Sequence, residues 1–185
     1  PTLRKISAER IQVELVKTLT SSRPDLLREA WKLGITKEFL PEFDLAMETT
    51  QETVHHMYTV GEHILHTLME VRPDRILRLT MLLHDIGKPY MKTMDADGVA
   101  HFKGHPEKGS ELANEILHRL KFDNDTIRKV TKLVRYHDHR MPVTPAHVRR
   151  AIHEIGEDLF PLYLEVRRAD VSAQSMYQRE EKVAD

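Results

Sequence analysis

The sequence predicts an all-α fold, a helical bundle with one short loop or hairpin insert near residues 90–104. Apolar residues recur at helical spacing in segment after segment, and residues that favour helix starts stand before these segments. Only the insert shows the alternation of apolar and polar residues that is typical of strands. At 185 residues, 40% hydrophobic and 31% charged, the chain has the composition of a soluble globular protein with one main core.

The first elements are marked by capping residues. Ser7 can cap a helix that runs to about Thr20, because its hydroxyl accepts a hydrogen bond from a free backbone N–H. Pro24 stands where a second helix would start, and Gly34 ends it. Around Leu40–Glu42 the pattern is broken, and we expect an irregular stretch.

The middle of the chain predicts two helices and the insert. A long helix is expected from about Val54 to Val71, where Arg72–Pro73 terminates it, and the next from about Asp74 to Ile86. Between Met91 and Lys103 the alternating pattern and the central sequence Asp95–Gly98 indicate a short hairpin or loop.

Helical spacing then returns for the rest of the chain, and Asp123 or Asp125 and Thr144 are candidate caps. The first of the expected helices opens at Pro106 and has inward-facing residues as far as Leu120. The second runs from Asp123 or Asp125 to near His137. The last two run from Thr144 to Ile155 and from about Asp158 past Asp170.

Six histidines and aspartates end or interrupt these apolar stripes, where an unpaired polar group would be costly. His84, for example, falls on the buried face marked by Leu77 and Met81. Such residues, contributed by separate helices, would be most simply satisfied by one or two divalent cations, because imidazole nitrogen and carboxylate oxygen are metal ligands. The six are His63, His84, Asp85, His105, His137 and Asp170.

The order His63, His84-Asp85, Asp170 resembles the defining pattern of the HD superfamily of metal-dependent phosphohydrolases. His105 and His137 match the two extra histidines of members whose sites can be dinuclear. The match covers roughly residues 54–175. It implies one metal held by His63, His84, Asp85 and Asp170, with Asp85 bridging to a second metal at His105 and His137. The ion, whether Ni, Mn, Co, Fe, Zn or Mg, is left open because such sites accept several metals.

A closer resemblance lies within that superfamily. The segments His56–His63, Phe102–Pro106 and Val134–Asp138 resemble the HD domain that follows the catalytic head in bacterial CCA-adding tRNA nucleotidyltransferases and related poly(A) polymerases. Upstream, Ile6–Ile11 with Glu14-Leu15 is similar to the helix that leads out of the head and neck. The resemblance therefore divides the chain into a helical neck-like segment, 1–50, and an HD phosphohydrolase domain, 51–185.

The head of those enzymes has no counterpart in the sequence. A Gly-rich motif with paired catalytic aspartates is absent, and so is the Glu-Asp-x-x-Arg motif that selects nucleotides. We expect either an excised C-terminal part, with a nucleotidyltransferase head as its partner in a longer chain, or a stand-alone relative. By itself this chain should not add nucleotides.

Two functions compete. The resemblance implies a hydrolase acting on phosphate ends of nucleotides or RNA, such as monoesters or 2′,3′-cyclic phosphates, with Asp85 and Lys88 as catalytic residues. Lys88, one turn beyond the doublet, would bind and neutralise phosphate; the alternative is a solvated lysine at a helix end. The second function is a non-catalytic module that binds tRNA or supports a polymerase head. Six intact ligand positions favour hydrolysis.

His56 and Asp138 are candidates for residues next to the metal site. Each could orient a metal-binding side chain through the hydrogen bond of that side chain's outer atom.

Composition excludes several other classes. The absence of cysteine rules out disulfides, thiolate catalysis and Cys-ligated zinc. A net charge of -1 gives no overall electrostatic footprint for nucleic acid. Neither a signal peptide nor a spanning segment is found, so we expect a cytoplasmic protein with no membrane partner.

Overall fold

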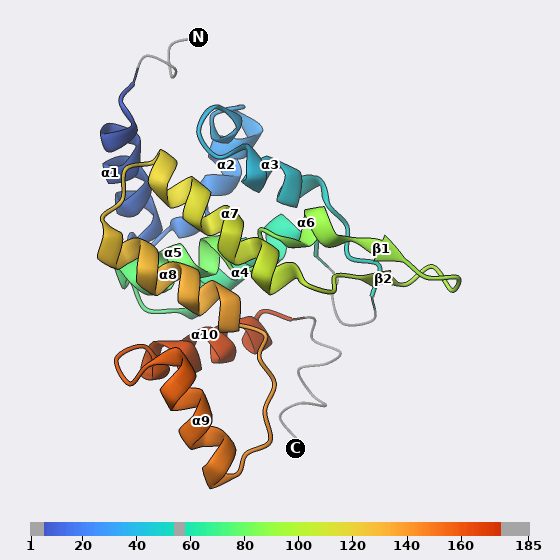
Figure 1. The fold of residues 1–185 in the computed structure, drawn as a ribbon. Coiled ribbons are helices and arrows are strands. Elements are labelled where there is room, and N and C mark those ends of the chain that lie inside the picture. The colour runs from blue at the N-terminus through green and yellow to red at the C-terminus, as the bar shows by residue number, and fades with distance from the viewer. Residues whose placement is uncertain (1–5, 54–57, 175–185) are drawn as a thin grey trace.

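The computed structural model describes residues 6–53 and 58–174, and within them the predicted all-α fold with a short hairpin is confirmed. Helices α4 (Val60–Glu70) and α5 (Arg75–Leu83) lie in the middle of the bundle, and helices from both halves of the chain pack around them (Figure 1). Among the described residues, no helix combines the length and apolarity that a membrane crossing requires.

The N-terminal elements follow the predicted caps, with one correction. Helix α1 (Ala8–Leu19) begins where the Ser7 side chain accepts from the Arg10 N–H. The second helix starts as the turn η2 (Pro24–Leu26) and continues as α2 (Leu27–Lys32), followed by the turn η3 (Thr36–Glu38). The expected irregular stretch was wrong, because helix α3 (Pro41–Glu48) forms there. Its proline occupies the first turn, where a helix loses no hydrogen bond, and the helix buries Phe43 in the core.

The two central helices are shorter than predicted. Thr59 caps α4 by accepting from the Glu62 N–H, so a start near Val54 was wrong; residues 54–57, with His56, lie outside the described residues. Helix α5 starts next to Asp74 as expected, with Asp74 as its cap, but it ends before His84 and not near Ile86, and a turn leads to the short α6 (Lys88–Met91). The predicted hairpin is confirmed as β1 (Thr93–Met94) paired antiparallel with β2 (Ala100–His101).

The last four helices agree with the sequence to within a few residues. They are α7 (His105–Arg119), α8 (Asn124–Tyr136) capped by Asp123, α9 (Pro145–Ile155) capped by Thr144, and α10 (Phe160–Ser172). Most buried apolar residues form one continuous core that reaches from α1 to α10. A smaller cluster, including Leu133, Ile155 and Tyr163, fixes α9 against α8 and α10 at the edge of the molecule (Figure 1).

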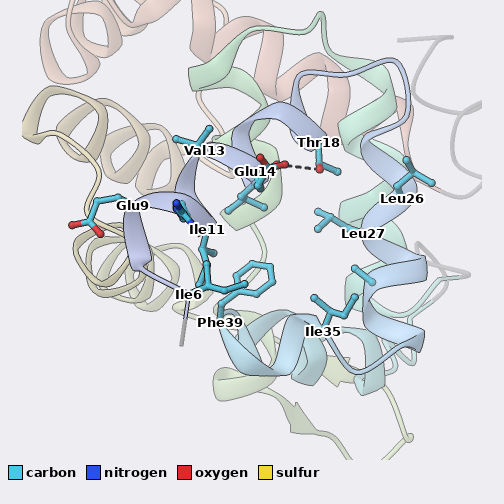
Figure 2. Close-up of a pocket in the computed structure, with 13 residues that line it drawn as sticks. Ile6, Glu9, Ile11, Val13, Glu14, Thr18, Leu26, Leu27, Ile35 and Phe39 are labelled. Carbon is cyan, nitrogen blue, oxygen red and sulfur yellow. Dashed lines mark hydrogen bonds between the residues drawn. The ribbon is translucent and has the colours of Figure 1, made fainter. Parts of the chain in front are cut away.

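An apolar groove of about 750 Å³ lies between α1 and the segment from η2 to η3. Figure 2 shows side chains of α1, among them Val13, across from Leu27, with Ile35 and Phe39 at one end. Val13 is 50% exposed, so the groove is open to solvent. None of the six candidate ligands lines it, which separates this groove from the polar cluster described next.

Candidate metal centre

The structure brings the six candidate ligands together from five parts of the fold. His63 lies on α4 and Asp170 on α10, whereas His84 and Asp85 occupy the turn that ends α5. His105 is the first residue of α7, and His137 directly follows α8. All six are buried; their donor atoms form two groups, each with its atoms within 4.8 Å of one another.

The first group contains His63, His84, Asp85 and Asp170. Asp170 Oδ1 lies 2.8 Å from His63 Nε2 and 3.3 Å from His84 Nε2. Asp85 Oδ2 lies 3.5 Å from each of the same two nitrogens. Two imidazoles and two carboxylates thus surround one point.

The second group contains Asp85, His105 and His137. Asp85 Oδ1 lies 3.2 Å from the Nε2 atoms of both histidines, and these two nitrogens are 3.3 Å apart. Asp85 therefore belongs to both groups, with one oxygen directed toward each.

Local backbone structure fixes the orientation of three of the histidines. The Nδ1 atoms of His84 and His137 lie 2.6 Å from the carbonyls of Met81 and Val134, in the last turn of α5 and of α8. Carbonyls at a helix end lack intrahelical partners, so a histidine just beyond the helix can bond to them. His105 bonds in the same way to the Phe102 carbonyl, after Gly104 turns the chain with φ +82°.

This arrangement fits a cation. A carbonyl oxygen only accepts hydrogen bonds, so Nδ1 of each of these histidines must carry a proton. In neutral imidazoles, Nε2 then presents a lone pair. The lone pairs of His105 and His137 face each other beside a carboxylate oxygen, which is unfavourable unless a positive charge lies between them. Imidazole and carboxylate donors suit first-row divalent ions.

The pKa shifts also point to positive charge in this cluster. Burial raises the pKa of Asp85, but the neighbouring Lys88 and His84 outweigh burial and hold that pKa well below its usual value. Burial likewise raises the pKa of Asp170, but hydrogen bonding to His63 and His84 opposes burial, and the pKa lies well below its usual value. For His84, burial lowers the pKa, yet the two carboxylates raise it overall. Both carboxylates stay ionised, and Lys88 balances one of the two negative charges, which leaves the other for a protonated imidazole or a metal ion.

A polar pocket of about 390 Å³ leads from the surface to this cluster. Asp85, His105, His137 and Asp170 contribute to its lining, together with Lys88. The ammonium of Lys88 lies 3.0 Å from Asp85 Oδ2, so Lys88 is a buried, paired cation and not the solvated lysine of the alternative.

Lys88 has a partner that sequence reasoning missed. Its Nζ donates to Gln51 Oε1 over 2.9 Å, and Gln51 is itself buried. The Phe102 ring also lies 5.3 Å below the ammonium. Gln51 lies in an irregular segment before α4, beside Glu52, whose carbonyl accepts from the β2 residue Ala100. The hairpin and this segment together hold Lys88 at the pocket.

The two proposed orienting residues have different outcomes. Asp138 lines the pocket, but its ionic partner is Arg167 at 3.6 Å. The outer nitrogens of His84, His105 and His137 bond to carbonyls instead of Asp138. His56 lies outside the described residues.

Comparison with known proteins gives two consecutive family matches. The model of the HD domain family matches residues 53–177. A second model, described as the probable RNA and SrmB-binding site of polymerase A, matches residues 1–47.

Individual relatives agree with these matches. The A-adding tRNA nucleotidyltransferase of Deinococcus radiodurans is 37% identical over 172 residues, covering 87% of this chain and 39% of that protein. The CC-adding tRNA nucleotidyltransferase of Thermus thermophilus is 34% identical over 179 residues, covering 93% of this chain and 41% of that protein. A bifunctional uridylyltransferase/uridylyl-removing enzyme of Ruegeria pomeroyi is 29% identical over 157 residues, covering 70% of this chain and 15% of that protein.

The chain spans about two fifths of the length of the two tRNA nucleotidyltransferases. The HD match covers well over half of this chain and contains every residue of the buried His and Asp cluster. The predicted resemblance is thereby confirmed: this chain belongs to the HD domain family and is similar to the tRNA nucleotidyltransferases.

Proposed function

We propose that this chain is a metal-dependent phosphohydrolase that acts on phosphate ends of nucleotides or RNA, such as phosphomonoesters or 2′,3′-cyclic phosphates. The proposal depends on one observation, the carboxylate of Asp85 directed toward two separate sets of donors at a polar pocket. His63, His84, Asp85 and Asp170 would hold one divalent ion, and Asp85, His105 and His137 a second.

Such an ion, when bound, supplies positive charge for phosphoryl oxygens and makes a bound water more acidic. The chain's own contribution is orientation and charge. Lys88, held by Gln51 and Asp85, is positioned to pair with a phosphate oxygen. Hydrolysis forms a bond from the water oxygen to phosphorus and breaks the bond from phosphorus to the leaving oxygen, which takes up the proton. The pocket requires no side chain as nucleophile.

The name of the relative from Ruegeria pomeroyi supports this class of chemistry. That enzyme is named for removing a uridylyl group, which is attached through phosphorus. Removal of such a group is a reaction at a phosphate ester, the chemistry that we propose for this pocket.

A second candidate function is an RNA-binding or structural module that supports a nucleotidyltransferase head. It is favoured by the match of residues 1–47 to a region described as a probable RNA-binding site. In this proposal the segment 1–50 acts as a neck and residues 51–185 as the HD domain.

One experiment separates the two candidates. The metal content of purified protein is measured, and phosphate release from 3′-AMP, 2′,3′-cyclic AMP and p-nitrophenyl phosphate is followed with and without Ni, Mn or Co. We expect metal-dependent hydrolysis that Asp85→Asn abolishes and that Asp158→Asn, a change at an exposed surface ion pair, leaves intact. Absence of hydrolysis across the panel, together with salt-sensitive tRNA binding, would favour the module instead.

A further inference from the structure

A second pocket, of mixed polar and apolar lining, lies next to the proposed active site, and Arg140 lines both. The second pocket measures about 240 Å³ and lies between the linker after α8 and the helix α9. The side chain or backbone of one residue thus borders both pockets, so Arg140 is the residue that a ligand spanning the two would meet.

The charges along this route suit an anion. Lys103 and Arg140 are exposed residues of the first pocket, and Arg150 is an exposed residue of the second. In the part of the chain that the structure describes, none of these three cations forms an ion pair. Nearby arginines do, since Arg167 pairs with Asp138 and Arg128 with Asp158.

The second pocket also offers more than charge. The exposed imidazole of His139 contributes to its lining, with Met141 and Pro142 beside it. The lining of the second pocket contains one acidic residue, Glu154, and two residues with guanidinium groups, Arg140 and Arg150. Guanidinium groups bind phosphates through two parallel hydrogen bonds, and imidazole faces can stack on unpaired bases.

We propose that the second pocket is a nucleotide subsite for an RNA strand whose terminal phosphate lies in the metal-centre pocket. This inference rests on the proposed function and specifies its substrate class, an oligoribonucleotide end in preference to a free mononucleotide. Arg140 would contact the strand between the two pockets, and Arg150 would bind the next phosphate.

The test compares binding of two ligands to the metal-loaded full chain, a short oligoadenylate ending in a 3′-phosphate and 3′-AMP. Fluorescence anisotropy or calorimetry gives the two Kd values at several salt concentrations. Arg150→Gln should weaken oligoadenylate binding about 10-fold and reduce the dependence of log K on log salt by about one, with 3′-AMP binding unchanged. Arg140→Gln should weaken binding of both ligands.

Arg149→Gln is the matched control, because Arg149 precedes Arg150 on α9, is also exposed, and does not line the pocket. It should leave both Kd values within about twofold. Equal weakening by Arg149→Gln and Arg150→Gln would overturn the subsite in favour of diffuse charge. The subsite would also be overturned if the oligoadenylate Kd of Arg150→Gln equals that of the wild-type chain.

Failure of the subsite and failure of the proposed hydrolysis can be told apart. If p-nitrophenyl phosphate is hydrolysed but Arg150→Gln does not affect the oligoadenylate, the subsite is wrong and the hydrolase stands. If Arg150→Gln weakens the oligoadenylate selectively but no substrate releases phosphate, the strand-binding route stands and the hydrolase is wrong.

Discussion

At the scale of single residues, Asp85 is the member of the cluster that no other side chain can replace. One of its oxygens faces His63 and His84, and the other faces His105 and His137. Asp170, the second carboxylate, contacts only the first of these pairs. A carboxamide at position 85 would present an NH₂ group to one set of donors, because an amide has only one acceptor oxygen.

Asp85→Asn should therefore lose metal affinity by at least about 100-fold, and hydrolysis with it. Elemental analysis after dialysis against a defined metal concentration measures the first effect, and phosphate release the second. Retention of the wild-type metal stoichiometry by Asp85→Asn would contradict the assignment of Asp85 as the shared ligand.

Lys88→Met should behave differently from Asp85→Asn. Lys88 contacts Asp85 and Gln51 but contributes no lone pair, so the metal should remain. Turnover should fall about 100- to 1000-fold, the usual effect of removing one group that stabilises transition-state charge. Lys129→Met is the control, because Lys129 pairs with Asp125 on α8 and does not line the pocket. Loss of metal in Lys88→Met would show that Lys88 maintains the centre itself.

The residues could be predicted from the sequence only where a periodic pattern marks a buried face. His84, His137 and Asp170 continue apolar stripes, and all three are buried at the cluster. Gln51 has no such signal, because it lies in an irregular segment and meets Lys88 across 37 positions of sequence. The direction of each Asp85 oxygen is likewise set by tertiary packing.

At the scale of elements, helix ends shape the candidate site. His84 and His137 each follow the last turn of a helix and bond to a carbonyl of that turn. Predicted caps identified three helix starts, at Ser7, Asp123 and Thr144. The start of α4 was misplaced because apolar spacing before Thr59 resembles a continued helix. Helix α3 was missed because the pattern is broken around Leu40–Glu42, although a proline is compatible with the first turn of a helix.

The turn between α5 and α6 approaches α7 so closely that only glycine fits at position 87. A Cβ there would lie 2.4 Å from the His105 carbonyl oxygen and 2.6 Å from the Gly109 nitrogen, both backbone atoms. Gly87→Ala must push the turn that carries Asp85 away from the helix that carries His105.

We expect Gly87→Ala to lower the free energy of unfolding by about 1–3 kcal/mol and to weaken metal binding. Urea denaturation and metal titration measure the two effects. The control is Gly98→Ala in the hairpin turn, where a Cβ meets nothing within 4 Å and only the positive φ of +75° adds strain. Wild-type metal affinity in a destabilised Gly87→Ala protein would show that the α5–α7 contact serves stability alone.

At the scale of the whole molecule, the cluster joins helices that are distant in sequence. Donors come from α4, the turn after α5, α7, the end of α8 and α10, so no single segment holds a complete ligand set. The unfolded chain should therefore bind a divalent ion far more weakly than the folded protein. Binding then stabilises the fold by mass action.

The measurable consequence is a metal-dependent Tm. At a free metal concentration about 100 times Kd the stabilisation is about 2.7 kcal/mol, which for a domain of this size raises Tm by about 5–10 °C. Differential scanning calorimetry of metal-free protein, titrated with Mn, Co or Ni, measures the shift, and excess EDTA should reverse it. In Asp85→Asn the shift should largely disappear, because both donor groups lose their shared carboxylate. An equal shift in Asp85→Asn would mean that the stabilising ion binds elsewhere on the protein. Measured binding without any shift would mean that the ligands are assembled in the unfolded chain as well, contrary to their distribution over the fold.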